Sequence, residues 1–175
     1  MTEAEALTGP RVLLRPFRLS DVPAVLVYAS DPEVTRHLEW DAYDDPATAA
    51  AFIRSTHAGG AVWIARAIVL AATDEVIGGA DLRIVSARDR RAEIGYGLAR
   101  AHWGHGYAAE AAALLVRYGF ERLGLVRIQA LCAVDNLRSA RTLERLGMRL
   151  EGRLAHYRVK GERARDHWVY ALTRA

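Results

Sequence analysis

The amino-acid sequence predicts an α+β fold with a mixed, mostly antiparallel sheet of about seven strands and about four helices. Strand-like apolar runs come in groups between helix-like runs, and this mixed order fits a sheet with helices layered on it. Helix-like runs show apolar periodicity or are rich in alanine. Gly, Pro and Asp residues mark the ends of most runs.

In the first half of the chain, Arg11 to Phe17 is typical of a strand that ends near Pro16, because proline cannot donate to a sheet. Leu19-Ser20-Asp21 offers capping residues for the helix that follows. Asp45-Pro46 opens a later helix, and Gly59-Gly60 ends it. The segments expected here are helices over 22–29, about 33–38 and 46–56, and strands over 62–71 and 76–85.

In the second half, the expected segments are strands over 92–99, 126–134, 149–159 and 164–172 and helices over 107–122 and 136–146. Period-two alternation in the strand 92–99 separates its side chains between two faces, Ile94, Tyr96 and Leu98 on one and Glu93, Gly95 and Gly97 on the other. In the helix 107–122, Glu110, Arg117 and Glu121 are expected to share the solvent-exposed face.

The composition indicates a single domain over residues 1–175, with a core over about 11–172. Hydrophobic residues at 51% and charged residues at 26% are ordinary for a soluble globular protein. Apolar runs fall short of membrane-spanning length, and the N-terminus lacks a basic-then-apolar signal pattern. Cys132 is the single cysteine, which excludes an intrachain disulfide and makes the reducing cytoplasm the expected location.

The net charge of +3 is small, and Lys160 is the only lysine among the positive side chains. The arginines are spread along the chain instead of forming one stripe, so nucleic-acid binding is not expected. The densest group, at 88–91, is typical of a solvated hairpin turn. No spacing of His, Cys and Asp resembles a metal site, so no metal cofactor is expected.

The most informative stretch is 102–111, which reads His-Trp-Gly-His-Gly-Tyr-Ala-Ala-Glu-Ala between a strand and an Ala-rich helix. Gly104 and Gly106 make a turn that can expose several backbone N–H groups, and the helix directs its positive dipole end to the same place. This combination suits an anion, in particular a pyrophosphate. The alternative is an ordinary turn, because glycine serves turns of every kind and short motifs give false positives.

A second segment, at 135–148, reads Asp-Asn-Leu-Arg-Ser-Ala-Arg-Thr-Leu-Glu-Arg-Leu-Gly-Met. These two segments, in this order and at this separation, resemble the GCN5-related N-acetyltransferase (GNAT) family. They are most similar to its RimJ/RimL-like branch of ribosomal-protein N-terminal acetyltransferases. The resemblance covers about residues 11–172 and implies acetyl-CoA as cosubstrate. It also implies a fold whose central strands splay apart.

The resemblance places acetyl-CoA between the strands 92–99 and 127–134. Asn136 is expected to contact the pantetheine arm; it can also serve as a helix N-cap, and the two roles are compatible. The broader family has Gln or Arg where this chain has Ala101, a change that the RimJ/RimL-like branch tolerates. The backbone residues implied for the pantetheine are Leu98, Ala99 and Arg100, and those for the pyrophosphate are Gly104, His105, Gly106, Tyr107, Ala108 and Ala109.

Two residues are candidates for catalysis. Many family members carry a tyrosine acid where this chain has Leu143, and Ser139, on the same helical face, is the expected substitute beside the CoA sulfur. The alternative for Ser139 is a small residue chosen for packing. Glu93 matches the general base of some members, which is needed because an amine is protonated near neutral pH. Its alternative is a strand glutamate paired with an arginine.

Trp40 and Tyr157 are expected to bind the acceptor at a cleft rim, where acids near Asp41 can attract a cation. The favoured acceptor is a protein N-terminal amine. The alternatives are a polyamine or an antibiotic amine, or a non-catalytic acyl-CoA-binding module. Cys132 is expected in the core, so transfer from thioester to amine should be direct. A homodimer is compatible with this interpretation.

Overall fold

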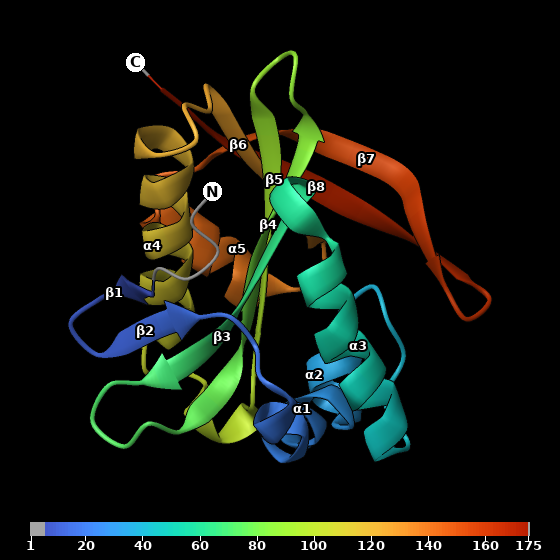
Figure 1. Ribbon diagram of the computed structural model, residues 1–175. Helices are drawn as coiled ribbons and strands as arrows, with labels where there is room; N and C mark the ends of the chain where they lie inside the picture. The colour runs from blue at the N-terminus through green and yellow to red at the C-terminus, as the bar shows by residue number, and fades with distance from the viewer. Residues whose placement is uncertain (1–5, 175) are drawn as a thin grey trace.

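The computed structural model describes residues 6–174, with the side chain of residue 61 left aside. Its elements are shown in Figure 1. In chain order they are β1 (Leu7–Thr8), β2 (Val12–Arg15), the 3-10 helix η1 (Leu19–Asp21), α1 (Val22–Ala29), α2 (Pro32–Thr35), α3 (Pro46–Ala58), η2 (Gly60–Val62), β3 (Trp63–Leu70), β4 (Val76–Ser86), β5 (Arg91–Leu98), η3 (Arg100–His102), α4 (Tyr107–Glu121), β6 (Arg127–Ala133), α5 (Leu137–Arg145), β7 (Arg149–Lys160) and β8 (Arg163–Thr173).

All of these strands form one eight-stranded sheet in the order β1-β2-β3-β4-β5-β6-β8-β7. Neighbouring strands are antiparallel except β5 and β6, which run parallel. The parallel pairing covers only three residue pairs, from Arg91–Arg127 to Glu93–Gln129. Beyond Glu93 the two strands are no longer paired, so the sheet opens at its centre.

Helices cover both faces of this sheet (Figure 1): α1, α2 and α3 lie on one face and α4 and α5 on the other. The core therefore has two parts. Leu82, Leu115 and Ile128 are fully buried in the part that packs against α4, and Phe17 and Ile53 in the part beneath α1 and α3. Full burial of one such side chain contributes about 1.5–3 kcal/mol. Both helix layers are thus held firmly beside the central opening.

The predicted α+β class, the mixed sheet and the sequence of helices and strands are confirmed. The structure adds β1, and it ends α2 at Thr35, short of the expected residue 38. The next residues form a turn in which the Leu38 N–H donates to the Thr35 carbonyl at 2.9 Å. This turn carries His37 and Leu38 to the central opening.

The expectation that Glu110 lies on the exposed face of α4 is wrong. Its Oε1 accepts the N–H groups of Arg11 at 2.7 Å and Val12 at 3.0 Å, and its Oε2 accepts Arg11 Nε at 2.8 Å. The Glu110 side chain is only 13% exposed, because the segment leading into β2 lies over it. Helical periodicity could not reveal a cover that comes from the distant N-terminal strands.

A buried ion pair ties β2 to the start of α1. Arg15 donates Nη1 and Nη2 to Asp21 at 2.7 and 2.9 Å, and the Arg18 N–H donates to the same carboxylate at 2.8 Å. Burial alone would raise the pKa of Asp21, but these hydrogen bonds outweigh burial and hold that pKa below its usual value. The pair therefore fixes the entry into the α1–α3 layer.

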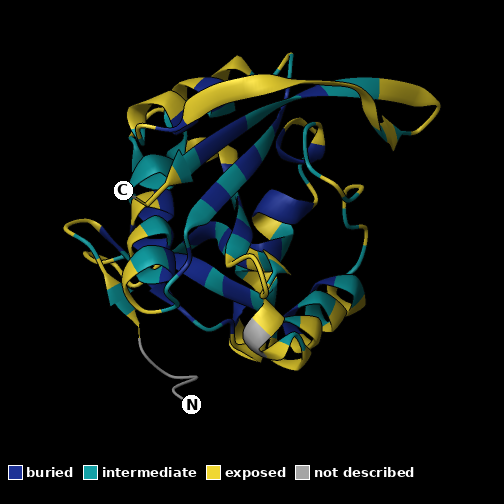
Figure 2. Cartoon of the chain, turned by 90° about the horizontal axis from the view of Figure 1, so that it is seen from above, coloured by how far each residue is buried: buried dark blue, intermediate teal, exposed yellow. Residues whose placement is uncertain are grey.

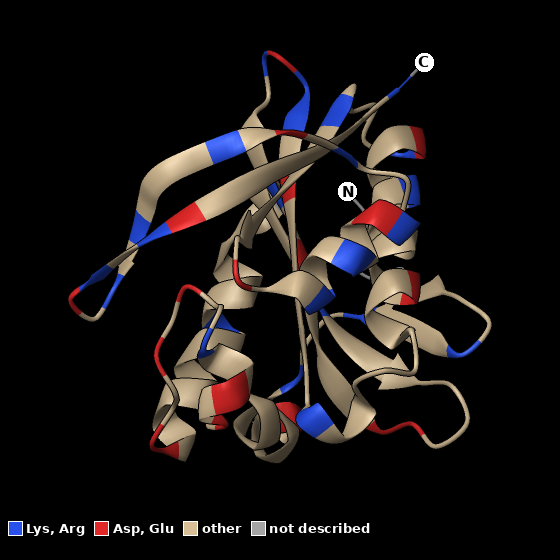
Figure 3. Cartoon of the chain, turned by 180° about the vertical axis from the view of Figure 1, so that it is seen from behind, with Lys and Arg blue, Asp and Glu red and all other residues tan. Residues whose placement is uncertain are grey.

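The last two strands, β7 and β8, form a long hairpin that extends beyond the body of the molecule (Figure 1). Most of β7 is exposed, as Figure 2 shows. Positive and negative residues are interspersed along the elements (Figure 3). Among the helices of residues 6–174, none is long and apolar enough to cross a membrane.

Candidate active site

The opening beside β5 exposes part of that strand's backbone. The Ala99 N–H donates to the Ile77 carbonyl at 2.8 Å, which extends the pairing with β4. Backbone groups of an antiparallel strand alternate in direction, so Tyr96 and Leu98 turn theirs towards the opening. One of them is already used, because Trp103 Nε1 donates to the Leu98 carbonyl at 2.9 Å. The stretch from Tyr96 to Leu98 is therefore the edge with which an extended ligand can pair.

Two cavities reach this opening. The first, here called the groove, has a volume of about 670 Å³ and is lined by the start of α4 and by α5. The second, here called the chamber, has a volume of about 350 Å³ and lies between β4, β5 and the α1–α3 layer. Molecules bound in the two cavities would meet at the residues that line both, which are His37, Leu38, Tyr96, Gly97, Asn136 and Ser139.

The glycine loop forms one end of the groove. Gly104 and Gly106 have φ angles of +83° and +82°, a left-handed conformation that glycine adopts without steric cost. Gly106 directly precedes α4, and its carbonyl accepts the Glu110 N–H at 3.1 Å. The N–H groups of residues 107–109 therefore have no acceptor within the helix, and these residues line the groove. This arrangement suits an anion, as the sequence indicated.

Three arginines of α5 also line the groove, although they were not among the site residues expected from the sequence. They are Arg138, Arg141 and Arg145, and their spacing places them on one side of the helix. The Arg138 guanidinium lies 4.7 Å from the centre of the Trp103 ring. The helical spacing of these arginines was the signal that could have revealed them. Their charges add to the dipole of α4, so the groove favours a polyanionic ligand.

Three of the residues expected at the cofactor lie outside the lining of the groove. Ala99 is buried and paired with β4. Arg100 starts the short helix η3, and its Nε lies 3.1 Å from Asp31 Oδ2. His105 turns away and stacks on the Tyr107 ring at 5.6 Å. The other expected residues, Leu98, Gly104, Gly106, Tyr107, Ala108, Ala109, Asn136 and Ser139, do line it.

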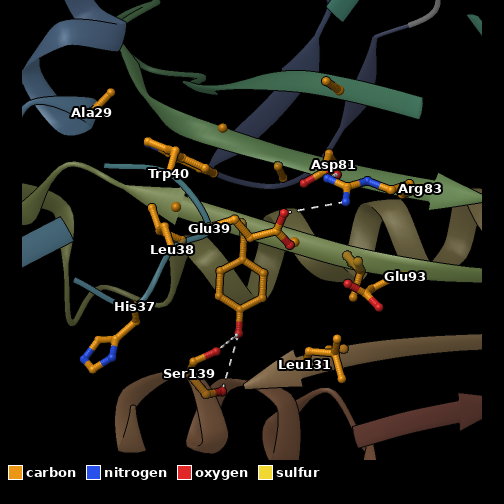
Figure 4. Close-up of a pocket in the computed structure, with 18 of the residues that line it drawn as sticks. Ala29, His37, Leu38, Glu39, Trp40, Asp81, Arg83, Glu93, Leu131 and Ser139 are labelled. Carbon is orange, nitrogen blue, oxygen red and sulfur yellow. Dashed lines mark hydrogen bonds and ion pairs between the residues drawn. The ribbon is translucent and has the colours of Figure 1, made fainter. Parts of the chain in front are cut away.

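Ser139 and Tyr96 form a hydrogen-bonded pair where the groove meets the chamber (Figure 4), with 3.0 Å between Oγ and the phenol oxygen. Burial raises the pKa of Tyr96 to about 12, so the phenol keeps its proton near neutral pH. The N-cap interpretation of Asn136 is confirmed, because its Oδ1 accepts the Ser139 N–H at 3.2 Å. The sequence placed Tyr96 on an apolar strand face but gave no sign of its partner on α5.

Cys132 lies beside this pair and is a core residue, as expected. It is 2% exposed, and its thiol donates to the Asn136 carbonyl at 3.4 Å. Burial raises the pKa of the thiol, so little thiolate exists near neutral pH. Leu143, which occupies the position of the family's tyrosine, is also buried. Neither residue offers a nucleophile or an acid.

Glu93 lines the chamber (Figure 4) and is shared between two donors. Gln129 Nε2 donates to its Oε2 at 3.3 Å, and Arg158 lies 3.7 Å from its Oε1. Arg158 is closer to Glu39, at 2.5 Å, and Arg83 is 3.7 Å from Glu39. These contacts agree with the alternative that Glu93 is a strand glutamate paired with an arginine, whereas its position in the chamber agrees with a role as general base.

Asp81 is a second carboxylate of the chamber, which the sequence analysis did not single out. It lies on β4 opposite Gly95 of β5. Trp63 Nε1 donates to its Oδ2 at 2.9 Å, while the nearest cation, Arg83, is 3.9 Å away. Burial raises the pKa of Asp81. A buried carboxylate with a raised pKa in a cavity is a candidate for binding or proton transfer.

The structure separates the two residues expected at the acceptor site. Trp40 lines the chamber (Figure 4). Tyr157 lies on the exposed hairpin, 44% exposed, with its ring 5.5 Å from His167, and it lines neither cavity. Successive side chains of a strand point to opposite faces, so Arg158 of β7 lines the chamber while its neighbour Tyr157 points away from it. His37, from the same segment as Trp40, lines both cavities. Burial lowers the pKa of His37 despite Asp135 at 3.4 Å.

The chain was compared with known proteins. Residues 11–149 match the acetyltransferase (GNAT) domain. The chain belongs to the GNAT acetyltransferase family. It is 35% identical over 170 residues to the uncharacterised N-acetyltransferase p20 of Bacillus licheniformis, covering 96% of each chain. It is 32% identical over 173 residues to the uncharacterised N-acetyltransferase YoaA of Bacillus subtilis, again covering 96% of each.

Solved structures agree with this assignment. A GNAT-family acetyltransferase from Bacillus anthracis superposes with a TM-score of 0.88 at 27% identity, covering 97% of this chain and 98% of that one. Mycobacterium smegmatis RimJ, solved in complex with CoA-disulfide, superposes with a TM-score of 0.86 at 26% identity, covering 94% and 86%. The predicted family is confirmed, and the protein is an acetyl-CoA-dependent N-acetyltransferase. Within residues 6–174, no group of three or more metal-ligating side chains gathers.

Proposed function

We propose that this N-acetyltransferase binds acetyl-CoA in the groove and an amine in the chamber. The acetyl group then passes between them beside Tyr96 and Ser139. The observation that carries the proposal is the meeting of the two cavities at this hydrogen-bonded pair. A thioester that ends there can be attacked by an amine from the other side, which replaces a chance encounter by a fixed orientation.

The groove supplies contacts for each part of the cosubstrate. The pyrophosphate receives N–H groups of Gly104 and residues 106–109 together with the dipole of α4. Arg138 and Arg141 supply charged donors to the phosphates. The pantetheine pairs with the open edge of β5 around Leu98, and the Asn136 amide reaches it from α5.

The chemistry then needs one proton acceptor and one proton donor. The amine first loses its proton to a carboxylate of the chamber, for which Glu93 and Asp81 are the candidates. The amine nitrogen forms a bond to the thioester carbon, and the C–S bond breaks. The Ser139 and Tyr96 hydroxyls donate hydrogen bonds to the departing sulfur. The sulfur receives the second proton, which the nitrogen loses as the amide forms, and leaves as the CoA thiol. Cys132 takes no part.

The favoured acceptor is the N-terminal amine of a protein, supported by the motif resemblance and by the structural likeness to RimJ. A small free amine is the alternative, because a chamber of about 350 Å³ can hold a small molecule. A non-catalytic acyl-CoA-binding module is disfavoured, because hydroxyls and carboxylates converge at the junction of the cavities.

A thiol-release screen tests this proposal. The full chain is incubated with acetyl-CoA and, separately, with N-terminal peptides, polyamines and aminoglycosides, and free CoA is measured. Amine-dependent CoA release that falls strongly in Ser139→Ala supports transfer at the junction. Binding of CoA without release for any amine would instead support the binding module.

A further inference from the structure

One wall of the chamber is aromatic. Two of the chain's three Phe, three of its seven Tyr and two of its four Trp line this cavity. Phe52 of α3 is central, since its ring lies 5.3 Å from Phe17, 6.4 Å from Tyr43 and 6.2 Å from Trp63. Such a wall favours a flat apolar group and attracts a cation over its ring faces.

Three glycines lie on the side of the chamber that is formed by the sheet. Gly79 of β4 pairs with Gly97 of β5, and Asp81 pairs with Gly95. A Cβ on Gly95 would lie 2.7 Å from Asp81 Oδ1, so this carboxylate rests over the backbone of β5, one residue before Tyr96. A Cβ on Gly97 would meet nothing nearer than a Leu38 methyl at 3.5 Å. Gly97 therefore leaves room for a ligand, two residues along β5 from the glycine over which the Asp81 carboxylate lies.

The charges in the chamber are unevenly balanced. Arg158 lies within 2.5 Å of Glu39 and 3.7 Å of Glu93, whereas the nearest cation to Asp81 is Arg83 at 3.9 Å. The close partner of Asp81 is the neutral indole N–H of Trp63. Asp81 is thus the chamber carboxylate with the weakest cation pairing, and a bound ammonium group would complete it.

Three buried polar atoms of the chamber residues also lack a hydrogen bond within residues 6–174. They are the Tyr28 hydroxyl, on a side chain that is 3% exposed, Trp40 Nε1, and His37 Nδ1, which lies 3.4 Å from an Asp135 carboxylate oxygen. All three residues line the cavity. A buried polar group without a hydrogen bond costs about 1–3 kcal/mol, and a bound molecule with a polar atom would remove that cost. The chamber therefore has the character of a site that is complete only when a ligand is present.

We infer that the acceptor is a cationic amine that carries an aromatic or bulky apolar group. Its ammonium docks on Asp81, and its apolar group packs against the wall around Phe52. The inference rests on the proposed function for the reaction, but it concerns binding and is measurable without turnover. Docked against Asp81, which lies over Gly95, the amine is near the point where β5 and β6 separate, so it can pass its proton to a carboxylate and attack a thioester held beside Tyr96.

Calorimetry on the full chain with saturating CoA tests the inference with three probes. Phenethylammonium has both features, 2-phenylethanol lacks the charge, and ethylammonium lacks the ring. Phenethylammonium should bind at least tenfold more tightly than either, a difference of about 1.4 kcal/mol per tenfold. Asp81→Asn should remove this advantage over 2-phenylethanol. The matched control Asp74→Asn changes the same charge on an exposed turn and should retain it.

Equal binding of phenethylammonium and 2-phenylethanol by the parent protein overturns the inference, as does unchanged binding in Asp81→Asn. If Asp81→Asn fails to fold, Gly97→Ala is tested in its place. Gly97→Ala should weaken the binding of phenethylammonium but not that of ethylammonium, and equal effects on both ligands count against the inference. A tripeptide that begins with Phe distinguishes a peptide N-terminus from a small free amine as the acceptor. If it binds more tightly than phenethylammonium, the chamber is assigned to a peptide N-terminus. Asp81-dependent binding without CoA release from acetyl-CoA would leave the inference standing and contradict the proposed transfer at this junction.

Discussion

Tyr96→Phe is the most informative single change, because it removes one oxygen and keeps the ring. In a purely structural role, the hydroxyl contributes one buried hydrogen bond to Ser139, and its loss costs about 0.5–1.5 kcal/mol of folding stability. The rate of transfer would then hardly change. If the pair donates to the departing sulfur, kcat should fall by about 10²-fold, which corresponds to about 2.7 kcal/mol of transition-state stabilisation.

The same magnitude is expected for Ser139→Ala, and the double variant decides whether the hydroxyls act together. Residues that act as a unit are not additive, so Tyr96→Phe/Ser139→Ala should lose about as much as the worse single variant. Steady-state CoA release gives kcat, urea unfolding gives the free energy of unfolding, and calorimetry confirms that CoA affinity is nearly kept. Burial raises the pKa of Tyr96 to about 12, so the phenol should show no titration between pH 6 and 9 in the rate profile.

A catalytic role of the pair is excluded if both single variants keep kcat within about twofold of the parent while the free energy of unfolding drops by about 1 kcal/mol. That result would assign Ser139 and Tyr96 to packing alone. A drop in Ser139→Ala without one in Tyr96→Phe would leave Ser139 as the single donor.

Four further outcomes are expected. Gly106→Val, at a φ of +82°, should weaken CoA binding at least tenfold, or about 1.4 kcal/mol by calorimetry, and unchanged affinity in a folded variant would remove the loop from the site. Double-reciprocal plots of initial velocity should give intersecting lines, and mass spectrometry should find no acetylated Cys132, because burial raises the pKa of that thiol. Parallel lines would contradict direct transfer. If Glu93 or Asp81 is the general base, the corresponding variant, Glu93→Gln or Asp81→Asn, should flatten the rise of kcat/KM with pH. Unchanged pH profiles in both variants would mean that neither carboxylate is the base. Asp21→Asn should cost about 3–5 kcal/mol in urea unfolding, because it leaves Arg15 buried without its partner. The pKa of Asp21 is lower in the folded protein than in the unfolded chain, so its carboxylate should stabilise the fold fully above the unfolded pKa of about 3.9. This contribution should be lost as the pH falls through the folded pKa. A free energy of unfolding that does not change with pH in this range would argue against the Arg15–Asp21 pair.

Most elements of the fold could be predicted because their signals are local. The expected helix over 22–29 matches α1, and the expected helix over 107–122 matches α4 within one residue. The short α2 was harder, since residues 36–38 leave the helix to reach the central opening. Glu110 shows the limit of such patterns: periodicity placed it correctly on α4, but the strand that covers it lies about a hundred residues away, beyond any local window.

The candidate site divides in the same way. The glycine loop, the N-cap at Asn136 and the core position of Cys132 follow from local geometry, and the structure has all three. Tyr157 was expected near Trp40 because both lie in segments that border the family's acceptor site. β7 does reach the chamber, but alternation along the strand points Arg158 into it and Tyr157 away from it. The arginines of α5 were readable from their spacing, whereas Asp81 was not, since an acid in a strand usually faces solvent.

Local signals in the sequence are enough to predict the strand and helix periods, the glycine turn before α4 and the family to which the motifs point, because these depend on residues close to one another in the chain. Which side chains meet depends on tertiary packing. Tyr96 and Ser139 are 43 residues apart, and they touch because β5 and β6 separate after Glu93 and let α5 approach the gap. The position of Asp81 over Gly95 likewise depends on the register of two strands, which long-range packing sets.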